Sequence, residues 1–255
     1  MAGESQTPGM QEHGHMLPAL YQAQAVQGWS NGMLRVIDSL LERNLEDAGC
    51  LLELGCGGGH FLQHWQEHHQ RQTLYGVDLH AAALPQARSL LRRSAYLCQS
   101  DGCFLPFPTA YFDAVVAFDV LDQRGVETRI ALAESWRVLK PEGWLLLRVS
   151  AYQWLYGMHD LAFNTAHRFT PKELSCTVTA AGFRVERITF ANSLLAIPLI
   201  TLRLLQRWRW MAFRTATYRS SLTNHLLERV LNVEAALLQR MNLPAGLSLY
   251  LLAKK

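Results

Sequence analysis

The residues of this chain with the clearest chemical meaning form a glycine-rich loop after an apolar segment. The run Leu51–His60 reads LLELGCGGGH and places Glu53 just before four glycines. Glycine has no Cβ, so glycines at the end of a buried parallel strand let the backbone approach a ligand closely. The dinucleotide fingerprint G-x-G-x-x-G is not met, because its third glycine would fall on His60. The loop therefore predicts a nucleotide-type cofactor site of a kind other than an NAD site.

Further acids follow at the spacing of one α/β unit. The β-rich run LYGVDLH contains Asp78, about 20 residues past the glycines. A carboxylate at this position can accept hydrogen bonds from both hydroxyls of a ribose. Asp101 and Gly102 precede a Leu-Pro-Phe turn, and a strand is expected over Phe112–Phe118.

The pattern Glu53-x-Gly55-x-Gly57-x-Gly59 resembles the first motif of class I S-adenosylmethionine-dependent methyltransferases. The later segments are similar to that family's following motifs, and together they resemble the branch typified by ubiquinone and menaquinone biosynthesis over about residues 51–190. The resemblance implies S-adenosylmethionine as co-substrate, with Asp78 on the ribose, Leu79 on the adenine and Asp101 on the adenine amino group. The cofactor contacts that it implies are Glu53, Gly55, Cys56, Gly57, Gly59, Asp78, Leu79, Asp101, Gly102 and Phe118. The chain departs from the branch at two positions. Gln123 stands where a histidine is usual, and Glu142 replaces the first glycine of the usual Pro-Gly-Gly turn, which here reads Pro141-Glu142-Gly143.

Methyl transfer from a sulfonium needs mainly alignment, and it needs a base only if the acceptor holds its proton firmly. Candidates are expected beyond the fifth strand, in the aromatic-rich segment Tyr152–Leu174. We expect His159, Asp160 and His167 to be the catalytic candidates, by partial similarity to some bacterial relatives. The alternative is that they hydrogen-bond and anchor the loop. Thr170 is predicted to cap a helix that begins at Pro171.

The elements that must position these residues alternate as in a doubly wound α/β fold. We expect helices within residues 17–45, a helix over Phe61–Gln70, and strands ending near Leu54, Val77, Gln99, Phe118 and Val149. A helix ending at Leu139, a turn over residues 140–143 and a helix over Pro171–Ala181 are also expected. The strands FRVERITF and LSLYLLAKK complete a mostly parallel seven-stranded sheet of the class I methyltransferase, Rossmann-like kind. The roughly fifty residues between these two strands are predicted to be a helical insertion over residues 191–243. We expect one domain over residues 17–255, preceded by a disordered tail over residues 1–16.

Composition limits the compartment and the partners. The five cysteines are odd in number and form no C-x-x-C pair, and the first residues are polar, so a cytoplasmic location is expected. A net charge of +3 does not indicate nucleic acid. His60, His64 and His68 are four residues apart, but no carboxylate or thiolate completes a ligand set, so we expect a solvated helix face and no metal.

Charge is distributed unevenly toward the end of the chain. No acid occurs between Ile188 and Leu227, and Arg203, Arg207 and Arg214 share one helical stripe. A lid or dimer surface is the favoured interpretation, and a peripheral membrane contact through Leu194–Arg214, at the inner surface of the membrane, is the alternative. The sequence thus predicts methyl transfer to a small or lipophilic metabolite, at oxygen or activated carbon. The alternatives are a non-catalytic cofactor-binding scaffold and a peripheral membrane enzyme acting on isoprenoid or glycolipid acceptors.

Overall fold

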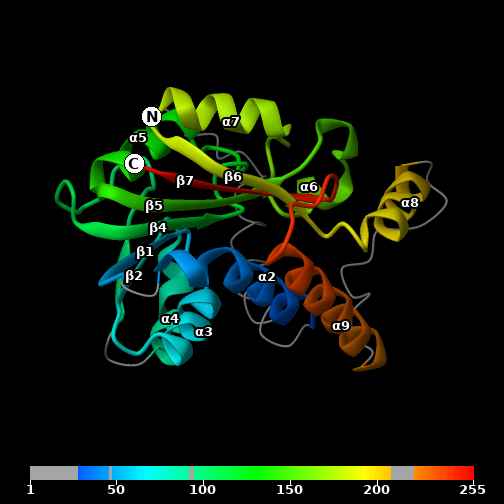
Figure 1. The fold of residues 1–255 in the computed structure, drawn as a ribbon, viewed down its shortest axis with the longest axis horizontal. Coiled ribbons are helices and arrows are strands. Elements are labelled where there is room, and N and C mark those ends of the chain that lie inside the picture. Colours follow the sequence, from blue (N-terminus) through cyan, green and yellow to red (C-terminus); the bar gives the residue numbers. More distant parts are fainter. Residues whose placement is uncertain (1–27, 46–47, 92–94, 208–220) are drawn as a thin grey trace, which may run out of the picture.

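The fold is built on one seven-stranded sheet (Figure 1). The computed structural model describes residues 28–45, 48–91, 95–207 and 221–255. The strand order is β3-β2-β1-β4-β5-β7-β6, and β7 runs antiparallel to both of its neighbours while the other pairs are parallel. The strands are β1 (Cys50–Leu54), β2 (Thr73–Asp78), β3 (Ala95–Gln99), β4 (Phe112–Phe118), β5 (Leu139–Ser150), β6 (Arg184–Ala191) and β7 (Ser248–Lys254). The predicted doubly wound, mostly parallel sheet is therefore confirmed.

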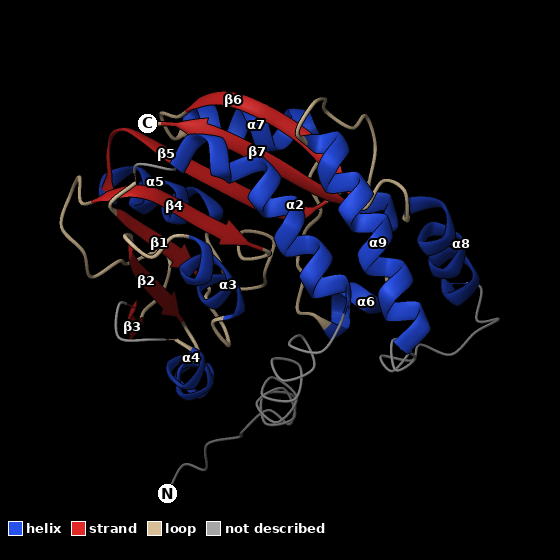
Figure 2. Ribbon diagram, turned by 60° about the horizontal axis from the view of Figure 1, so that its bottom comes forward, coloured by secondary structure: helices blue, strands red, loops and turns tan. Residues whose placement is uncertain are grey.

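Helices cover both faces of the sheet, with α5 and α7 on one face and α2, α3, α4 and α9 on the other (Figures 1 and 2). Because both faces are covered, β1 and β4 are almost continuously apolar rather than alternating. The helices are α2 (Gly28–Leu45), α3 (His60–His68), α4 (Leu84–Leu90), α5 (Thr128–Val138), α6 (Met158–Ala162), α7 (Pro171–Ala180), α8 (Ala196–Arg207) and α9 (Ser221–Leu238), with short 3-10 turns η1 (Ala81–Ala83) and η2 (Gln153–Leu155). The part of the predicted leading helices before Gly28 lies outside the described residues.

The turn predicted over residues 140–143 is incorporated into β5. Pairing with β4 passes from Phe112↔Leu139 to Ala114↔Trp144, so the extra residues bulge out while the ladder continues on either side. Glu142 takes a left-handed conformation with φ of 61°. Since Leu139 already pairs with β4, it begins the strand instead of ending the preceding helix, which corrects the predicted boundary.

Helices α8 and α9 lie between β6 and β7, where the sequence predicts a helical insertion. Helix α9 packs closely along α2, since a Cβ added at Gly32 would lie 2.5 Å from the Cβ of Leu231. Glu234 of α9 is fully buried and accepts backbone N–H groups of Asn192, Ser193 and Leu194 just after β6. These contacts attach the insertion to the sheet through both its packing and its hydrogen bonds.

The predicted cap of α7 is confirmed. The Thr170 hydroxyl accepts the Glu173 N–H at 3.2 Å, and the Glu173 carboxylate accepts the Thr170 N–H at 3.4 Å. This reciprocal pair satisfies two of the N–H groups that a helix start leaves unbonded. It fixes the point where the segment that follows β5 re-enters regular structure.

Candidate active site

The glycine loop leaves β1 in a conformation that favours glycine. Gly55, Gly57 and Gly59 have φ of 68°, 49° and 81°. A Cβ on Gly55 would lie 2.5 Å from Cγ2 of Val120, and one on Gly59 would lie 2.9 Å from Cβ of Ala87. The loop therefore needs glycine for its own packing, in addition to any approach of a ligand.

Asp78 joins this loop to the end of β2. Its Oδ2 accepts the N–H of Gly57 at 2.8 Å, and its Oδ1 accepts the N–H of His80 at 2.8 Å. The residue is only 5% exposed. Each carboxylate oxygen retains a lone pair, so the group holds the loop and can still accept ligand hydroxyls.

Glu53 lies beneath the loop with an unsatisfied oxygen. The residue is 5% exposed, and its Oε2 has no hydrogen-bond partner in the described part of the chain. Burial, and then the charge of Asp78, raise the pKa of Glu53 well above its usual range, with Arg148 opposing this shift. A buried polar atom without a partner is a candidate to bond a ligand, so these residues fit a cofactor held above the glycine loop.

The other predicted cofactor contacts surround the same strand ends. Leu79 is 57% exposed beside Asp78, and Cys56 is buried with its N–H bonded to the carbonyl of Val77 at 2.9 Å. Asp101 turns back on its own loop, with Oδ1 accepting the Cys103 N–H at 2.8 Å. A Cβ on Gly102 would meet open space.

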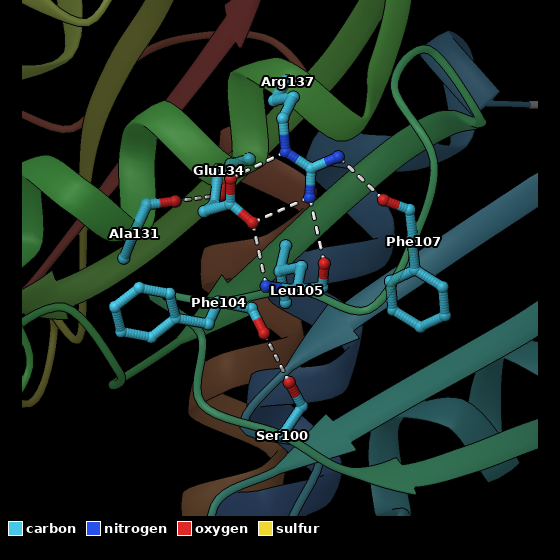
Figure 3. A network of polar contacts seen from close by, with 8 residues as sticks. Ser100, Phe104, Leu105, Phe107, Ala131, Glu134 and Arg137 are labelled. Carbon is cyan, nitrogen blue, oxygen red and sulfur yellow. Dashed lines mark hydrogen bonds and ion pairs between the residues drawn. The ribbon is translucent and has the colours of Figure 1, made fainter.

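The loop that carries Asp101 is held by α5 (Figure 3). Glu134 accepts the N–H of Leu105 at 2.8 Å, and Arg137 donates to the carbonyls of Phe107 and Leu105 at 2.7 and 3.0 Å. The two side chains also bond each other, which lowers the pKa of Glu134 and favours its charged form. The β3–β4 connection, which contains no helix, is thereby fixed against the sheet.

A row of three side chains with Arg148 at its centre crosses the strand ends, and it was not identified from the sequence. Phe118, Arg148 and Tyr250 are register partners on β4, β5 and β7, so their side chains share a face. Arg148 lies 5.4 Å from the Phe118 ring centre and bonds Asp119 through both Nε and Nη2, at 3.0 and 2.5 Å. Burial alone would lower the pKa of Arg148, but Asp119 outweighs it and holds the guanidinium charged. A single arginine within the apolar strand sequence WLLLRVS was the signal available for this row.

Two strand exits near this row contain strained residues. Asp119 after β4 and Tyr152 after β5 have φ of 55° and 61°, which is unusual for residues other than glycine. Tyr152 stacks on Phe190 with ring centres 5.3 Å apart. Such conformations persist where the surroundings enforce them and occur often at functional sites.

Asp122 connects the exits of β4 and β5. It is 1% exposed, and its Oδ2 accepts the Ser150 N–H at 2.9 Å while its Oδ1 has no partner among the residues that the structure describes. Its carbonyl accepts the N–H groups of Ala166 and His167. Burial, and then Asp119, raise the pKa of Asp122 to about 6.

The three catalytic candidates lie in different environments. Asp160 is fully buried, with Oδ1 bonded to Arg168 and Oδ2 accepting the Gly157 N–H at 2.8 Å. His167 bonds Glu173 at 2.7 Å, beside the cap of α7. His159 is exposed on α6 and stacks on Phe163, with ring centres 4.4 Å apart. Asp160 and His167 thus bond groups that anchor the loop, and His159 is exposed on α6.

The solvated face expected for the histidines of α3 is wrong at His64. Its Nε2 lies 2.8 Å from Asp38 of α2, and its side chain is only 15% exposed. Helix α2 packs across this side of α3, which the helical period of α3 alone does not indicate. His68 remains exposed, with Nδ1 near the His64 carbonyl at 2.8 Å.

Comparison with known proteins agrees with this geometry. Residues 52–147 match the family model described as a methyltransferase domain. None of the curated proteins matches the chain.

Solved structures share the fold at low identity. The complex between the Haloferax volcanii Trm112 methyltransferase activator and a methyltransferase aligns with a TM-score of 0.65 and 16% identity, covering 95% of this chain and 96% of that one. The [4+2]-cyclase SpnF aligns with a TM-score of 0.60 and 20% identity, covering 89% of this chain and 80% of that one. A methyltransferase from Archaeoglobus fulgidus that depends on S-adenosylmethionine aligns with a TM-score of 0.57 and 17% identity, covering 89% of this chain and 95% of that one.

Residues 52–147 thus match a methyltransferase domain, and the glycine loop lies at the carboxyl edge of this sheet. The sheet around the matched residues has the fold of a solved S-adenosylmethionine-dependent methyltransferase.

Proposed function

We propose that the protein transfers the methyl group of S-adenosylmethionine to a small or lipophilic metabolite, at an oxygen or an activated carbon. The observation that carries this proposal is the orphaned Oε2 of Glu53 beneath the glycine loop, next to strained, aromatic-lined exits of β4 and β5. The rings of Phe118, Tyr152 and Phe190 at these exits offer apolar surface to a lipophilic acceptor.

The cofactor, when bound, supplies an electrophilic methyl group on a sulfonium. The protein's part is to hold the reacting groups in line. The glycine loop and Asp78 are placed to bind the cofactor, and Glu53 to bond one of its polar groups. Asp119, fixed by Arg148, and Tyr152, fixed on Phe190, form the exits where the acceptor would be held.

Within this proposal, His159 is the group that takes a proton from the acceptor. Replacing His159 by alanine should lower turnover by ~10²-fold or more and leave cofactor affinity unchanged, because general bases typically contribute 10² to 10⁴. The measurement is steady-state turnover together with calorimetric cofactor binding, with His68→Ala as the control on an exposed histidine of α3. Near-normal turnover of His159→Ala would assign the reaction to alignment alone.

The alternative from a different class is a scaffold that binds the cofactor without transferring its methyl group. Gln123, in place of a family histidine, is the feature that favours it. The two are separated by incubating the protein with S-adenosylmethionine and pooled lipophilic extracts and measuring S-adenosylhomocysteine. Release above that of a Gly55→Val variant supports the enzyme. Firm cofactor binding without release from any acceptor pool supports the scaffold.

A further inference from the structure

The carboxylate of Asp119 is exposed at the exit of β4, and its cationic partner lies behind it. The side chain of Asp119 is 45% exposed, whereas that of Arg148 on β5 is 17% exposed. Nε and Nη2 of Arg148 both donate to this carboxylate, and the N–H of Asp119 donates to the carbonyl of Arg148 at 2.9 Å. Asp119 is thus held in one orientation, with the guanidinium on one side and solvent on the other.

Asp119 lies between the glycine loop and the exit of β5, because β1 and β5 are the two neighbours of β4 in the sheet. The next residue, Val120, packs against the glycine loop, since a Cβ on Gly55 would lie 2.5 Å from its Cγ2. On the other side, Oδ2 of Asp122 joins the exits of β4 and β5 by accepting the N–H of Ser150. A molecule placed between the cofactor loop and the exit of β5 would therefore meet Asp119.

The ion pair limits which chemical group can bind there. An ionised carboxylate accepts hydrogen bonds and donates none, and each oxygen can accept more than one. An anionic group would be repelled by Asp119, and the guanidinium behind it is already engaged. A cationic amine bound to the same oxygens would lie close to the guanidinium of Arg148 and be repelled by it. A neutral hydroxyl donates a hydrogen bond without adding a charge, so it is the group that this pair fits best.

The exit of β5 offers apolar surface beside this carboxylate. Tyr152 stacks on Phe190, and the ring of Trp154 lies 6.2 Å from that of Tyr152, between ring centres. Trp154 is 57% exposed. A molecule held between the two exits would have aromatic rings on one side and a carboxylate on the other, which suits an apolar body that carries a hydroxyl.

The membrane contact expected through Leu194–Arg214 stays a prediction, because the side chains of Arg203, Arg207 and Arg214 lie outside the described residues. Among the helices that the structure describes, none is long and apolar enough to cross a bilayer.

We propose that Asp119, held by Arg148, binds a hydroxyl group of the methyl acceptor and thereby selects a neutral, hydroxyl-bearing molecule with an apolar body. The role of Asp119 is in binding, which separates it from the proton transfer proposed for His159. The inference rests on the proposed function and deepens it by narrowing the class of acceptor.

The first test uses the wild type with the pooled lipophilic extracts and measures release of S-adenosylhomocysteine. Acetic anhydride caps hydroxyl groups as esters, and mild alkali later removes these esters but leaves amides in place. The extract is exposed to the same alkali beforehand, so that its natural esters are already cleaved. Release should fall about tenfold or more after acetylation and return after alkaline hydrolysis, since a capped hydroxyl has no proton to donate.

The second test uses Asp119→Asn, which keeps the shape of the side chain and removes its charge. The amount of extract that gives half the maximal rate should rise about tenfold or more, because a charge-assisted hydrogen bond is replaced by a weaker one. The maximal rate should change less, and the affinity for S-adenosylmethionine, measured by calorimetry, should stay unchanged. Asp113→Asn is the matched control, since Asp113 also lies on β4 and bonds Lys140 of β5 at 2.8 Å, at the opposite end of the strand. Melting curves identify a variant that fails to fold, and the acetylation test needs no variant.

Equal release from acetylated and untreated extract would overturn the proposal. Release that alkali does not restore would assign an amine as the recognised group and would also overturn it. The same holds for unchanged half-saturation in folded Asp119→Asn, for an equal rise in Asp113→Asn, and for a loss of cofactor affinity in Asp119→Asn. Firm cofactor binding by the wild type without release from any untreated extract is a different result, since it contradicts the proposed function itself and the inference with it.

Discussion

Asp78 shows how a single carboxylate can both build the loop and serve its ligand. Its two oxygens accept the N–H groups of Gly57 and His80, so the side chain fixes the position of the glycine loop even without a cofactor. The ribose contact that the sequence predicts would use the remaining lone pairs of the same oxygens.

Replacing Asp78 by alanine should therefore weaken S-adenosylmethionine binding by roughly tenfold or more, since hydrogen bonds to a charged group contribute about 1.5 to 3 kcal/mol. Isothermal titration calorimetry measures this directly. Glu67→Ala, on an exposed position of α3, is the control and should bind normally. Unchanged affinity in a folded Asp78→Ala protein would contradict the cofactor assignment.

Asp122 gives a prediction on pH. Its ordinary pKa is 3.8, and burial followed by Asp119 raises it to about 6 in the folded protein. The folded state therefore binds this proton more tightly than the unfolded state. Stability is lost progressively as pH rises from about 4 to about 6, and the loss is complete above that range.

The variant Asp122→Asn should not lose stability in this way between pH 4 and pH 6, because an asparagine side chain does not titrate. We subtract the free energy of unfolding of the wild type from that of Asp122→Asn. This difference should increase by about 1 to 3 kcal/mol between pH 4 and pH 6, because the wild type loses stability over this range, and it should stay level above pH 7. Urea unfolding at a series of pH values measures the difference, and groups common to both proteins cancel. A difference that does not change with pH would mean that Asp122 titrates normally.

At the scale of elements, the segment between β5 and α7 is held by a buried ion pair. Arg168 and Asp160 are 2% and 0% exposed, and Arg168 also donates to the carbonyl of Ala151 at 2.9 Å. Removing one partner leaves the other charge buried and unpaired, which typically costs about 3 to 5 kcal/mol.

Arg168→Ala should thus be strongly destabilising and should open the segment to proteolysis. The double variant Asp160→Ala/Arg168→Ala should recover part of the loss, because no buried charge remains. Thermal melting and limited proteolysis measure these effects. Arg184→Ala removes an exposed ion pair with Glu186 and should change little. A small effect of Arg168→Ala would show that the segment is held mainly by its apolar packing.

At the scale of the whole molecule, the site draws on the ends of several strands of one sheet. Glu53, Asp78, Asp101 and Asp119 come from the ends of β1, β2, β3 and β4 or from the loops that follow them. A ligand that contacts these strand ends binds the folded state and not the unfolded state, because only folding brings the ends together. Its binding therefore stabilises the entire sheet by mass action.

S-adenosylmethionine at 100 times its dissociation constant should add about 2.7 kcal/mol of stability. For a chain of this length this corresponds to a rise in melting temperature of about 5 to 10 °C. S-adenosylhomocysteine should act in the same direction, and NAD should have no effect because the third glycine of the dinucleotide fingerprint is replaced by His60. Calorimetric melting with each ligand measures the shifts, and a shift with NAD alone would overturn the assignment.

The sequence by itself determined the sheet and the position of the glycine loop. Apolar strands, glycines and the Thr170 cap act over a few residues, and local pattern is sufficient to read such signals. The fifth strand could not be bounded in this way, because whether residues 139–143 turn or extend depends on pairing with β4.

Only the tertiary structure decided which side chains meet. The partners Asp38 and His64, Asp119 and Arg148, and Asp160 and Arg168 are separated by 26, 29 and 8 positions in the chain. Which of them are buried depends on how helices and strands pack, and burial in turn sets whether a carboxyl group is charged, as at Glu53 and Asp122. The spacing of residues therefore indicated a cofactor site, and the environment that gives each residue its role arises from packing between distant segments.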